Sequence, residues 1–157
     1  MNGLENTWGS KIATTNWKIG ELDIETARYS PIKEVYNYEI NNPSTSSGEI
    51  TYEAKIGLMY ASDYGYAASP ANWSTNIGSL NNDTNRNNNW MFMGLYEWTI
   101  SRRSDFTGNN AFYVYDAGSV NNYRVGGYRG VRPSFYLEST VTYISGSGTE
   151  SDPFRIA

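Results

Sequence analysis

The sequence contains neither cysteine nor histidine, and these two absences exclude much of the chemistry available to a protein of 157 residues. Without histidine there is no imidazole base for a serine nucleophile. Without cysteine there is no thiol nucleophile and no Cys/His zinc site. Disulfide bonds are excluded too, although this leaves the cellular compartment open.

Long apolar runs and excess positive charge are also missing. No stretch reaches the roughly 18 apolar residues that a membrane-spanning helix needs. No signal peptide follows Met1, so we expect any export signal or anchor to lie outside these residues. The formal net charge is −4, which does not favour nucleic acid as a partner.

Tyrosine, tryptophan and asparagine are abundant, with 14, 5 and 18 residues. Together they provide rigid amphipathic surface with adaptable hydrogen bonding, as in the binding loops of antibodies. The same composition is also common in secreted β proteins that have no such surface. Five of the eight arginines fall within residues 102–132: Arg102, Arg103, Arg124, Arg129 and Arg132.

The patterning predicts one β-rich α+β domain over residues 1–157, with short helices and a central antiparallel sheet. Residues 1–35 form an N-terminal arm and the start of a first helix, which Ser30 and Pro31 introduce. Residues 111–115 and 120–125 predict a β-hairpin. The stretch GVRPSFYL, residues 130–137, resembles a core strand, and its Pro133 favours an edge position or a strand end. Arg132 is expected to support this scaffold by hydrogen bonding to backbone carbonyls.

The stretch just before Gly130 is polar, aromatic and rich in glycine, and no periodicity dictates its residues. Tyrosine, tryptophan and arginine dominate binding hot spots, which suits a protein or glycan ligand. Each residue taken alone is more often an ordinary packed aromatic or a solvated arginine. The candidate ligand-binding set is Trp98, Arg102, Arg103, Phe106, Asn109, Asn110, Tyr113, Tyr123, Arg124, Tyr128 and Arg129.

Metal, phosphate and cofactor sites are not expected. The run from Asn81 to Asn85 imitates the start of a calcium loop, but Arg86 stands where that loop needs glycine and Phe92 where it needs glutamate. The glycines of residues 126–130 precede a strand rather than opening a helix, which contradicts a phosphate-binding loop.

A carbohydrate-active enzyme is a remote alternative, since glycosidases need only two carboxylates. The candidates nearest the aromatic region are Asp63, Glu97, Asp105 and Asp116. Their spacing does not place any two of them at a common site.

Several segments occur in an order that resembles the C-terminal domain of surface proteins of gut Firmicutes and related bacteria. Many members of that family begin with a type IV prepilin-type segment. The motifs are GLMYASDYGYA, WTIS, and VRPSFYL followed by SGSGTESDP, and the resemblance covers roughly residues 36–157. It implies an extracellular location at the cell surface and possible assembly into a pilus or attachment to a membrane-anchored chain.

The order of WTIS and VRP is also similar to the C-type-lectin-like fold of formylglycine-generating-enzyme relatives. Variable proteins of diversity-generating retroelements share that fold, and their variable codons lie near the C-terminus between fixed scaffold strands. The resemblance implies that residues 98–137 hold a variable ligand-binding region and a scaffold strand.

This sequence departs from those families in three respects. The cysteine pair that many pilin-type relatives carry around residues 73–89 is absent. The Glu-Pro-Asn and Trp-Asn-Asp motifs of calcium-dependent lectins are absent as well. The catalytic cysteines of the formylglycine-generating enzymes are also missing, which excludes that activity.

The sequence therefore predicts a non-enzymatic, adhesin-like binding domain without cofactor or metal. Its partner would be a protein or glycan on another cell, a host or a phage, and not nucleic acid. The main alternative is a structural pilin or pseudopilin head whose aromatic residues make subunit contacts.

Overall fold

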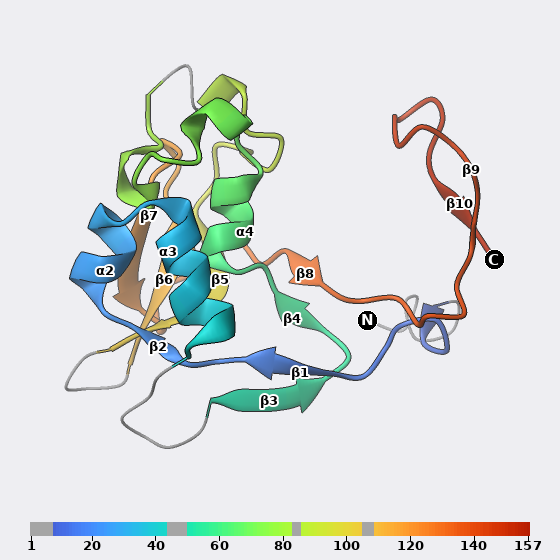
Figure 1. Cartoon of the computed structure of the whole chain (residues 1–157), viewed down its shortest axis with the longest axis horizontal. Coiled ribbons are helices and arrows are strands. Elements are labelled where there is room, and N and C mark those ends of the chain that lie inside the picture. Colours follow the sequence, from blue (N-terminus) through green and yellow to red (C-terminus); the bar gives the residue numbers. More distant parts are fainter. Residues whose placement is uncertain (1–7, 44–49, 83–85, 105–108) are drawn as a thin grey trace.

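The computed structural model describes residues 8–43, 50–82, 86–104 and 109–157. Its architecture is mixed α and β, with short strands and a few short helices. The chain forms a body, in which helices pack on a small sheet, and an arm that extends away from it (Figure 1). The arm consists of the C-terminal residues, which leave the body through the segment after the last strand of the sheet, and of the first described residues, which pair with them at the Ile12–Leu137 bridge. The predicted β-rich α+β class is confirmed.

The central sheet has four strands in the order β2-β5-β6-β7. β5 (Glu97–Arg103), β6 (Asn110–Val114) and β7 (Val120–Arg124) are antiparallel neighbours, and β2 (Glu21–Leu22) pairs with β5 in parallel. The predicted hairpin of β6 and β7 is confirmed. Its turn contains Gly118 at φ 92°, a conformation that glycine adopts without strain.

Three α-helices are described: α2 (Ile24–Tyr29), α3 (Ile32–Tyr36) and α4 (Ala61–Tyr66). Pro31 is the N-cap of α3, one position after the expected Ser30, and α3 continues into a π-helical turn, η1 (Asn37–Asn41). Two 3₁₀ turns, η2 (Pro70–Asn72) and η3 (Ile77–Ser79), follow α4. Tertiary packing must hold these helices in place, because helices this short are unstable alone.

The core lies between the helices and one face of the sheet. Tyr64 of α4 and Phe112 of β6 are fully buried there, and the Tyr64 hydroxyl donates to the Gly118 carbonyl oxygen at 2.9 Å. Val114 and Val120 face the same core, in agreement with the two-residue period of a strand. Ile32 and Val35 of α3 are buried in it as well. Helices thus cover one side of the sheet.

A second set of strands connects the body to the arm. β1 (Thr15–Lys18) pairs with β3 (Thr51–Ala54), and β4 (Gly57–Leu58) pairs with β8 (Pro133–Ser134). Trp17 of β1 is almost fully buried, and its ring lies so close to Gly57 that a Cβ there would sit 2.6 Å from it. Glycine is therefore needed where β4 passes this indole.

The expectation of a core strand over residues 130–137 is wrong. Only Pro133–Ser134 is β-structure, and the apolar residues around it are exposed by 61% at Val131, 38% at Phe135 and 40% at Leu137. Their alternation matched a half-buried strand, but the segment leaves the body here (Figure 1), and its contacts are local ones, such as the ring of Tyr136 against that of Trp17. The arm ends in a hairpin of β9 (Tyr143–Ser145) and β10 (Arg155–Ile156).

Candidate functional site: an aromatic face around Arg129

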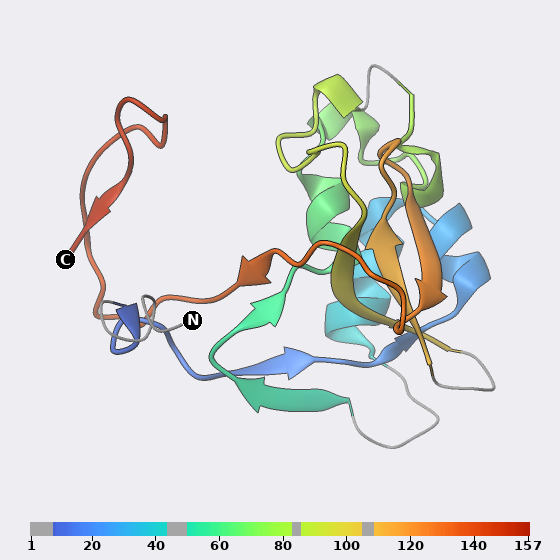
Figure 2. The same cartoon turned by 180° about the vertical axis from the view of Figure 1, so that it is seen from behind.

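Within the described part of the chain, no helix and no second sheet packs on the side of the central sheet that faces away from the helices. Figure 2 shows this side, with the segment that joins β7 to β8 crossing in front of the strands. Strand register sets which side chains project here. Trp98 lies opposite Tyr113, and Tyr123 lies opposite Ala111, two residues before Tyr113 on β6. These three aromatic residues therefore share one face.

Arg129 of the crossing segment lies among these rings. Its guanidinium carbon is 4.3 Å from the ring centre of Tyr113, 4.8 Å from that of Tyr123 and 5.4 Å from that of Trp98. Tyr96, just before β5, provides a fourth ring at 4.9 Å. These distances are within the range of cation–π attraction. We call these five residues the aromatic–arginine face.

Backbone hydrogen bonds of Gly130 hold the crossing segment against the start of β5. It forms a parallel bridge with Glu97, its N–H donates to the Tyr96 carbonyl oxygen at 2.7 Å, and its own carbonyl oxygen accepts the Trp98 N–H at 2.9 Å. Because side chains alternate along an extended chain, Arg129 projects to the open side, whereas Arg132 projects to the side of Glu97.

Arg132 ties the crossing segment to the body. Its guanidinium donates to both carboxylate oxygens of Glu97, at 3.2 and 2.7 Å, and to the Met91 carbonyl oxygen at 2.9 Å. The expected bond from Arg132 to a backbone carbonyl is confirmed. This bidentate pair fixes the segment on which Arg129 sits.

Cation–π attraction stabilises the face and offsets the burial of part of the guanidinium. A hydrogen bond with the Tyr115 side chain, helped by burial and by Asp116, raises the pKa of Tyr96 to about 12, so this ring stays neutral near pH 7. The Arg129 Nε is buried and has no hydrogen-bond partner among the described residues, at a cost of about 1–3 kcal/mol. Four ring contacts, each worth ~0.5–1 kcal/mol or more, offset that cost.

The structure brings together four of the predicted residues: Trp98, Tyr113, Tyr123 and Arg129. Tyr113 is 5% exposed and lies beneath Arg129, so it supports the face rather than presenting itself to a partner. Tyr128, beside Arg129, is 99% exposed. Sequence reasoning missed Tyr96, although its two-residue spacing from Trp98 indicates the same strand face.

The other predicted residues have different surroundings. The Arg102 side chain pairs with Glu21 at 3.0 Å, and the Arg103 side chain donates to the Asn122 side-chain oxygen at 2.7 Å. Asn109 and Arg124 are exposed, whereas Asn110 lies opposite Arg124 and is half-buried. Phe106 lies outside the described residues.

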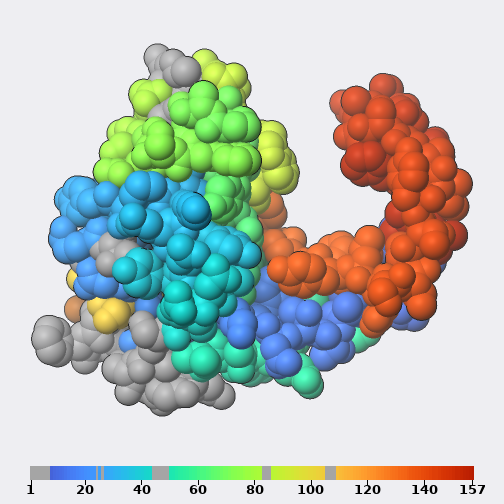
Figure 3. Space-filling model, in the orientation of Figure 1, coloured from blue at the N-terminus to red at the C-terminus, as the bar shows by residue number. Residues whose placement is uncertain are grey.

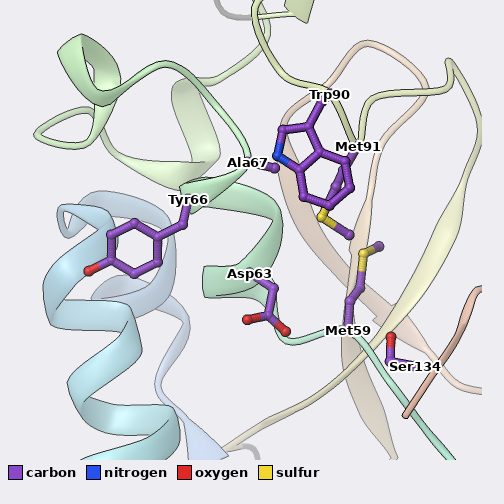
Figure 4. Close-up of a pocket in the computed structure, with 7 residues that line it drawn as sticks. All are labelled: Met59, Asp63, Tyr66, Ala67, Trp90, Met91 and Ser134. Atoms are coloured by element: carbon purple, nitrogen blue, oxygen red, sulfur yellow. The ribbon is translucent and has the colours of Figure 1, made fainter. Parts of the chain in front are cut away.

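A separate pocket of about 340 Å³ opens beside α4 (Figure 4). Two methionine side chains, Met59 and Met91, line it, and Trp90 lies at its rim with 79% of its surface exposed. Its carboxylate, Asp63, already accepts the Tyr60 backbone N–H at 2.8 Å, and burial raises its pKa. The pocket is thus apolar, and its acidic group caps α4.

Two of the four carboxylates proposed for an enzyme have structural roles. Glu97 is paired with Arg132, and Asp63 caps α4. Asp116 is exposed at the β6–β7 turn, and Asp105 lies outside the described residues. One further carboxylate is deeply buried: Glu39 accepts the Ala61 N–H at 3.2 Å, the Ser62 N–H at 3.1 Å and the Ser101 hydroxyl.

Within the described residues no group of three or more acidic side chains is placed to hold a metal ion. The calcium-like run falls largely on residues 83–85, outside the described part. None of the helices in the described part is both long and apolar enough to span a bilayer.

Comparison of the chain with protein-family models, with curated proteins and with solved structures found no match. The geometry of the aromatic–arginine face is therefore the basis for the function argued below.

Proposed function

We propose that this chain is a non-enzymatic, extracellular ligand-binding domain with a C-type-lectin-like fold, and that the aromatic–arginine face contacts its ligand. One observation supports this most strongly: four aromatic rings surround a guanidinium on a sheet face that no helix covers. Tyrosine, tryptophan and arginine are the residues that most often dominate binding energy.

The residues on the two sides of Gly130 have different contacts, which supports a variable surface on a fixed scaffold. Tyr128 and Arg129 precede Gly130 and make no hydrogen bond to the core in the described structure, whereas Arg132 follows it and holds Glu97. Substitution at Tyr128, which is 99% exposed, removes no packing from the body. Loop positions of this kind tolerate change.

An array of glycans and peptides tests the binding face. The variant Tyr123→Ala/Tyr128→Ala removes one exposed ring of the face and the exposed ring next to Arg129. The control Tyr29→Ala/Tyr52→Ala removes two exposed rings elsewhere. We expect the face variant to weaken binding of the array ligands at least about tenfold, which corresponds to ~1.4 kcal/mol. Equal binding by both variants would contradict the proposed face.

The diversification itself is tested in the genome. A near-identical template repeat beside a reverse transcriptase, differing from this gene only at adenines, would support the variable-protein proposal. The differing codons should include those of Tyr128 and Arg129 and omit that of Arg132. A genome without such a repeat would favour the structural alternative.

A structural head that makes subunit contacts is the second candidate, and the arm favours it. Trp8, Phe135 and Phe154 help line an apolar cavity of about 440 Å³ on the arm, and Phe154 is 66% exposed. Figure 3 shows the arm standing away from the body across an open hollow. The chain exposes 9375 Å², whereas a compact monomer of 17.7 kDa exposes about 7,900 Å².

The excess is roughly 1,400 Å², which exceeds the roughly 800 Å² that each chain contributes to a protein–protein interface of standard size. Sedimentation velocity over a range of concentrations tests this candidate. A concentration-dependent oligomer that Phe154→Ser abolishes, and that Tyr52→Ser leaves intact, would support subunit contacts through the arm. A monomer at all concentrations would contradict self-association through the arm.

A further inference from the structure

We propose that the ligand of the aromatic–arginine face is an oligosaccharide that carries carboxylate groups, and that the Arg129 guanidinium binds one of these carboxylates. This inference rests on the proposed function, since it names the ligand class of the same face. The arginines of the body differ in whether an acidic side chain pairs with them.

Two arginines of the body have acidic partners. Arg102 pairs with Glu21, and Arg132 pairs with Glu97; both glutamates are buried. Arg129 has no acidic partner among the described residues, and its neighbours are aromatic rings. Its charge is therefore attracted by ring faces but not neutralised, and an anionic ligand can supply the missing negative charge.

The rings also orient the guanidinium. Arg129 Nη1 donates to the Tyr128 carbonyl oxygen at 3.2 Å, and no bond of its Nη2 is found within the described structure. A guanidinium held by four rings has lost much of its side-chain freedom before a ligand arrives, which lowers the entropic cost of binding. The planar fork can then donate two parallel hydrogen bonds to one carboxylate.

The surface next to the guanidinium suits a sugar ring. Tyr123 is 53% exposed and Tyr128 is 99% exposed, so both present ring surface to solvent. The C–H groups of a pyranose face can pack on such rings, while its hydroxyls stay hydrated.

An extended acidic peptide fits this face less well. A peptide that added to the sheet beside β7 would need the main-chain groups of that edge strand. The Asn122 N–H already donates to the Asn121 side-chain oxygen at 2.9 Å, and the Arg124 carbonyl oxygen already accepts the Gly127 N–H at 3.0 Å. Both cavities described above lie away from the face.

Isothermal titration with defined oligosaccharides tests the inference. The probes are a galacturonic acid hexamer and a sialic acid hexamer, each with its carboxyl-reduced form, and a glutamate hexapeptide. The full chain is compared with Arg129→Lys, which keeps the charge but loses the fork, and with Arg155→Lys, a control on the arm. Thermal melting of each variant verifies folding.

We expect at least one acidic hexamer to bind at least tenfold tighter than its reduced form, and Arg129→Lys to lose at least tenfold of that affinity. Binding by the unmodified chain should also weaken between 50 and 500 mM NaCl, a readout that requires no variant. Arg155→Lys should bind as the parent does.

The inference is overturned if neither acidic hexamer binds better than its reduced form, if Arg129→Lys binds unchanged, or if the glutamate peptide binds tighter than both. If the chain binds neutral sugars and Tyr123→Ala/Tyr128→Ala abolishes that binding, the inference of an acidic ligand is overturned but the proposed function is not. Sugar or peptide binding that the same double variant leaves intact would overturn the proposed function too.

Discussion

At the scale of single residues, three buried carboxylates show how this chain handles charge in its interior. Glu21 and Glu97 each face an arginine, so their negative charges are neutralised. Glu39 faces backbone N–H groups at the start of α4 and the Ser101 hydroxyl instead. Desolvation by burial outweighs these hydrogen bonds and raises the pKa of Glu39 to about 7.

Folding stability should therefore fall as the pH rises. The folded state holds a proton on Glu39 up to about pH 7, whereas the unfolded chain releases it near 4.5. The unfolded state thus binds fewer protons between these values, and Glu39 lowers the free energy of unfolding by roughly 3 kcal/mol above pH 7. Urea melts at pH 5 and pH 8 measure this loss. Glu39→Gln should remove most of it, and an equal pH dependence in the variant would contradict the assignment.

Removing Arg132 should be strongly destabilising. Arg132→Ala leaves Glu97, which is only 5% exposed, without its bidentate partner. Breaking such a pair costs about 3–5 kcal/mol, because the remaining charge is uncompensated. Arg155→Ala is the control, since its pair with Asp152 on the arm is exposed and should cost less than about 1 kcal/mol. Similar unfolding free energies for the two variants would refute the scaffold role of Arg132.

At the scale of elements, close packing between α3 and α4 depends on Gly65. A Cβ at this position would lie 2.8–3.1 Å from three atoms of the Ile32 side chain, which is fully buried. Glycine normally weakens a helix by about 1 kcal/mol relative to alanine, so its presence inside α4 indicates a packing requirement. The two helices approach here as closely as their backbones permit.

Gly65→Ala should therefore destabilise the chain by about 1–3 kcal/mol, as overpacked cores do, despite its better helix propensity. The double variant Gly65→Ala/Ile32→Val should recover part of this loss relative to the sum of the single changes. Gly126→Ala, where a Cβ would meet nothing within 4 Å, is the neutral control. Thermal melts distinguish these cases, and a stabilised Gly65→Ala would show that the helices can separate without penalty.

The sequence predicted correctly those elements whose structure depends on residues close together in the chain. The β6–β7 hairpin was predictable because alternating residues and a short glycine-containing link encode it locally. Residues 130–137 carry the same alternation around Val131 and Phe135, yet they leave the body. Alternation indicates an extended chain but not whether another layer will pack against it.

The candidate site was predictable in composition but not in arrangement. Trp98, Tyr113 and Tyr123 could be expected on one face from strand periodicity. The placement of Arg129 among their rings could not, because it depends on the long-range bridge between Gly130 and Glu97. The sequence also could not show that the two arginines have different roles. Arg129 lies on the open side, whereas Arg132 pairs with a buried glutamate.

At the scale of the whole molecule, the two unusual surfaces belong to different parts of the chain. The aromatic–arginine face lies on the sheet of the body, whereas the apolar cavity around Phe135 and Phe154 lies on the arm (Figures 1 and 2). Ligand binding and subunit contact therefore need not compete for the same residues. A chain could use the arm for assembly and keep the face open.

This separation predicts independent effects of mutation. Phe154→Ser should change the sedimentation behaviour of an assembling chain while leaving array binding unchanged. Tyr123→Ala/Tyr128→Ala should do the reverse. Loss of both properties in either variant, with the fold intact by circular dichroism, would indicate that the two surfaces act as one.

The most direct test of the central claim is an NMR footprint of the tightest array ligand, read from the five tryptophan indole N–H signals. Trp98 belongs to the aromatic–arginine face, whereas Trp8 lines the arm cavity, Trp90 lines the pocket beside α4, and the Trp73 indole donates to the Ala68 carbonyl oxygen elsewhere on the body. The account predicts that the Trp98 signal shifts on titration while those of Trp8 and Trp73 stay in place. A shift confined to Trp8 or Trp90, with Trp98 unchanged, would contradict it.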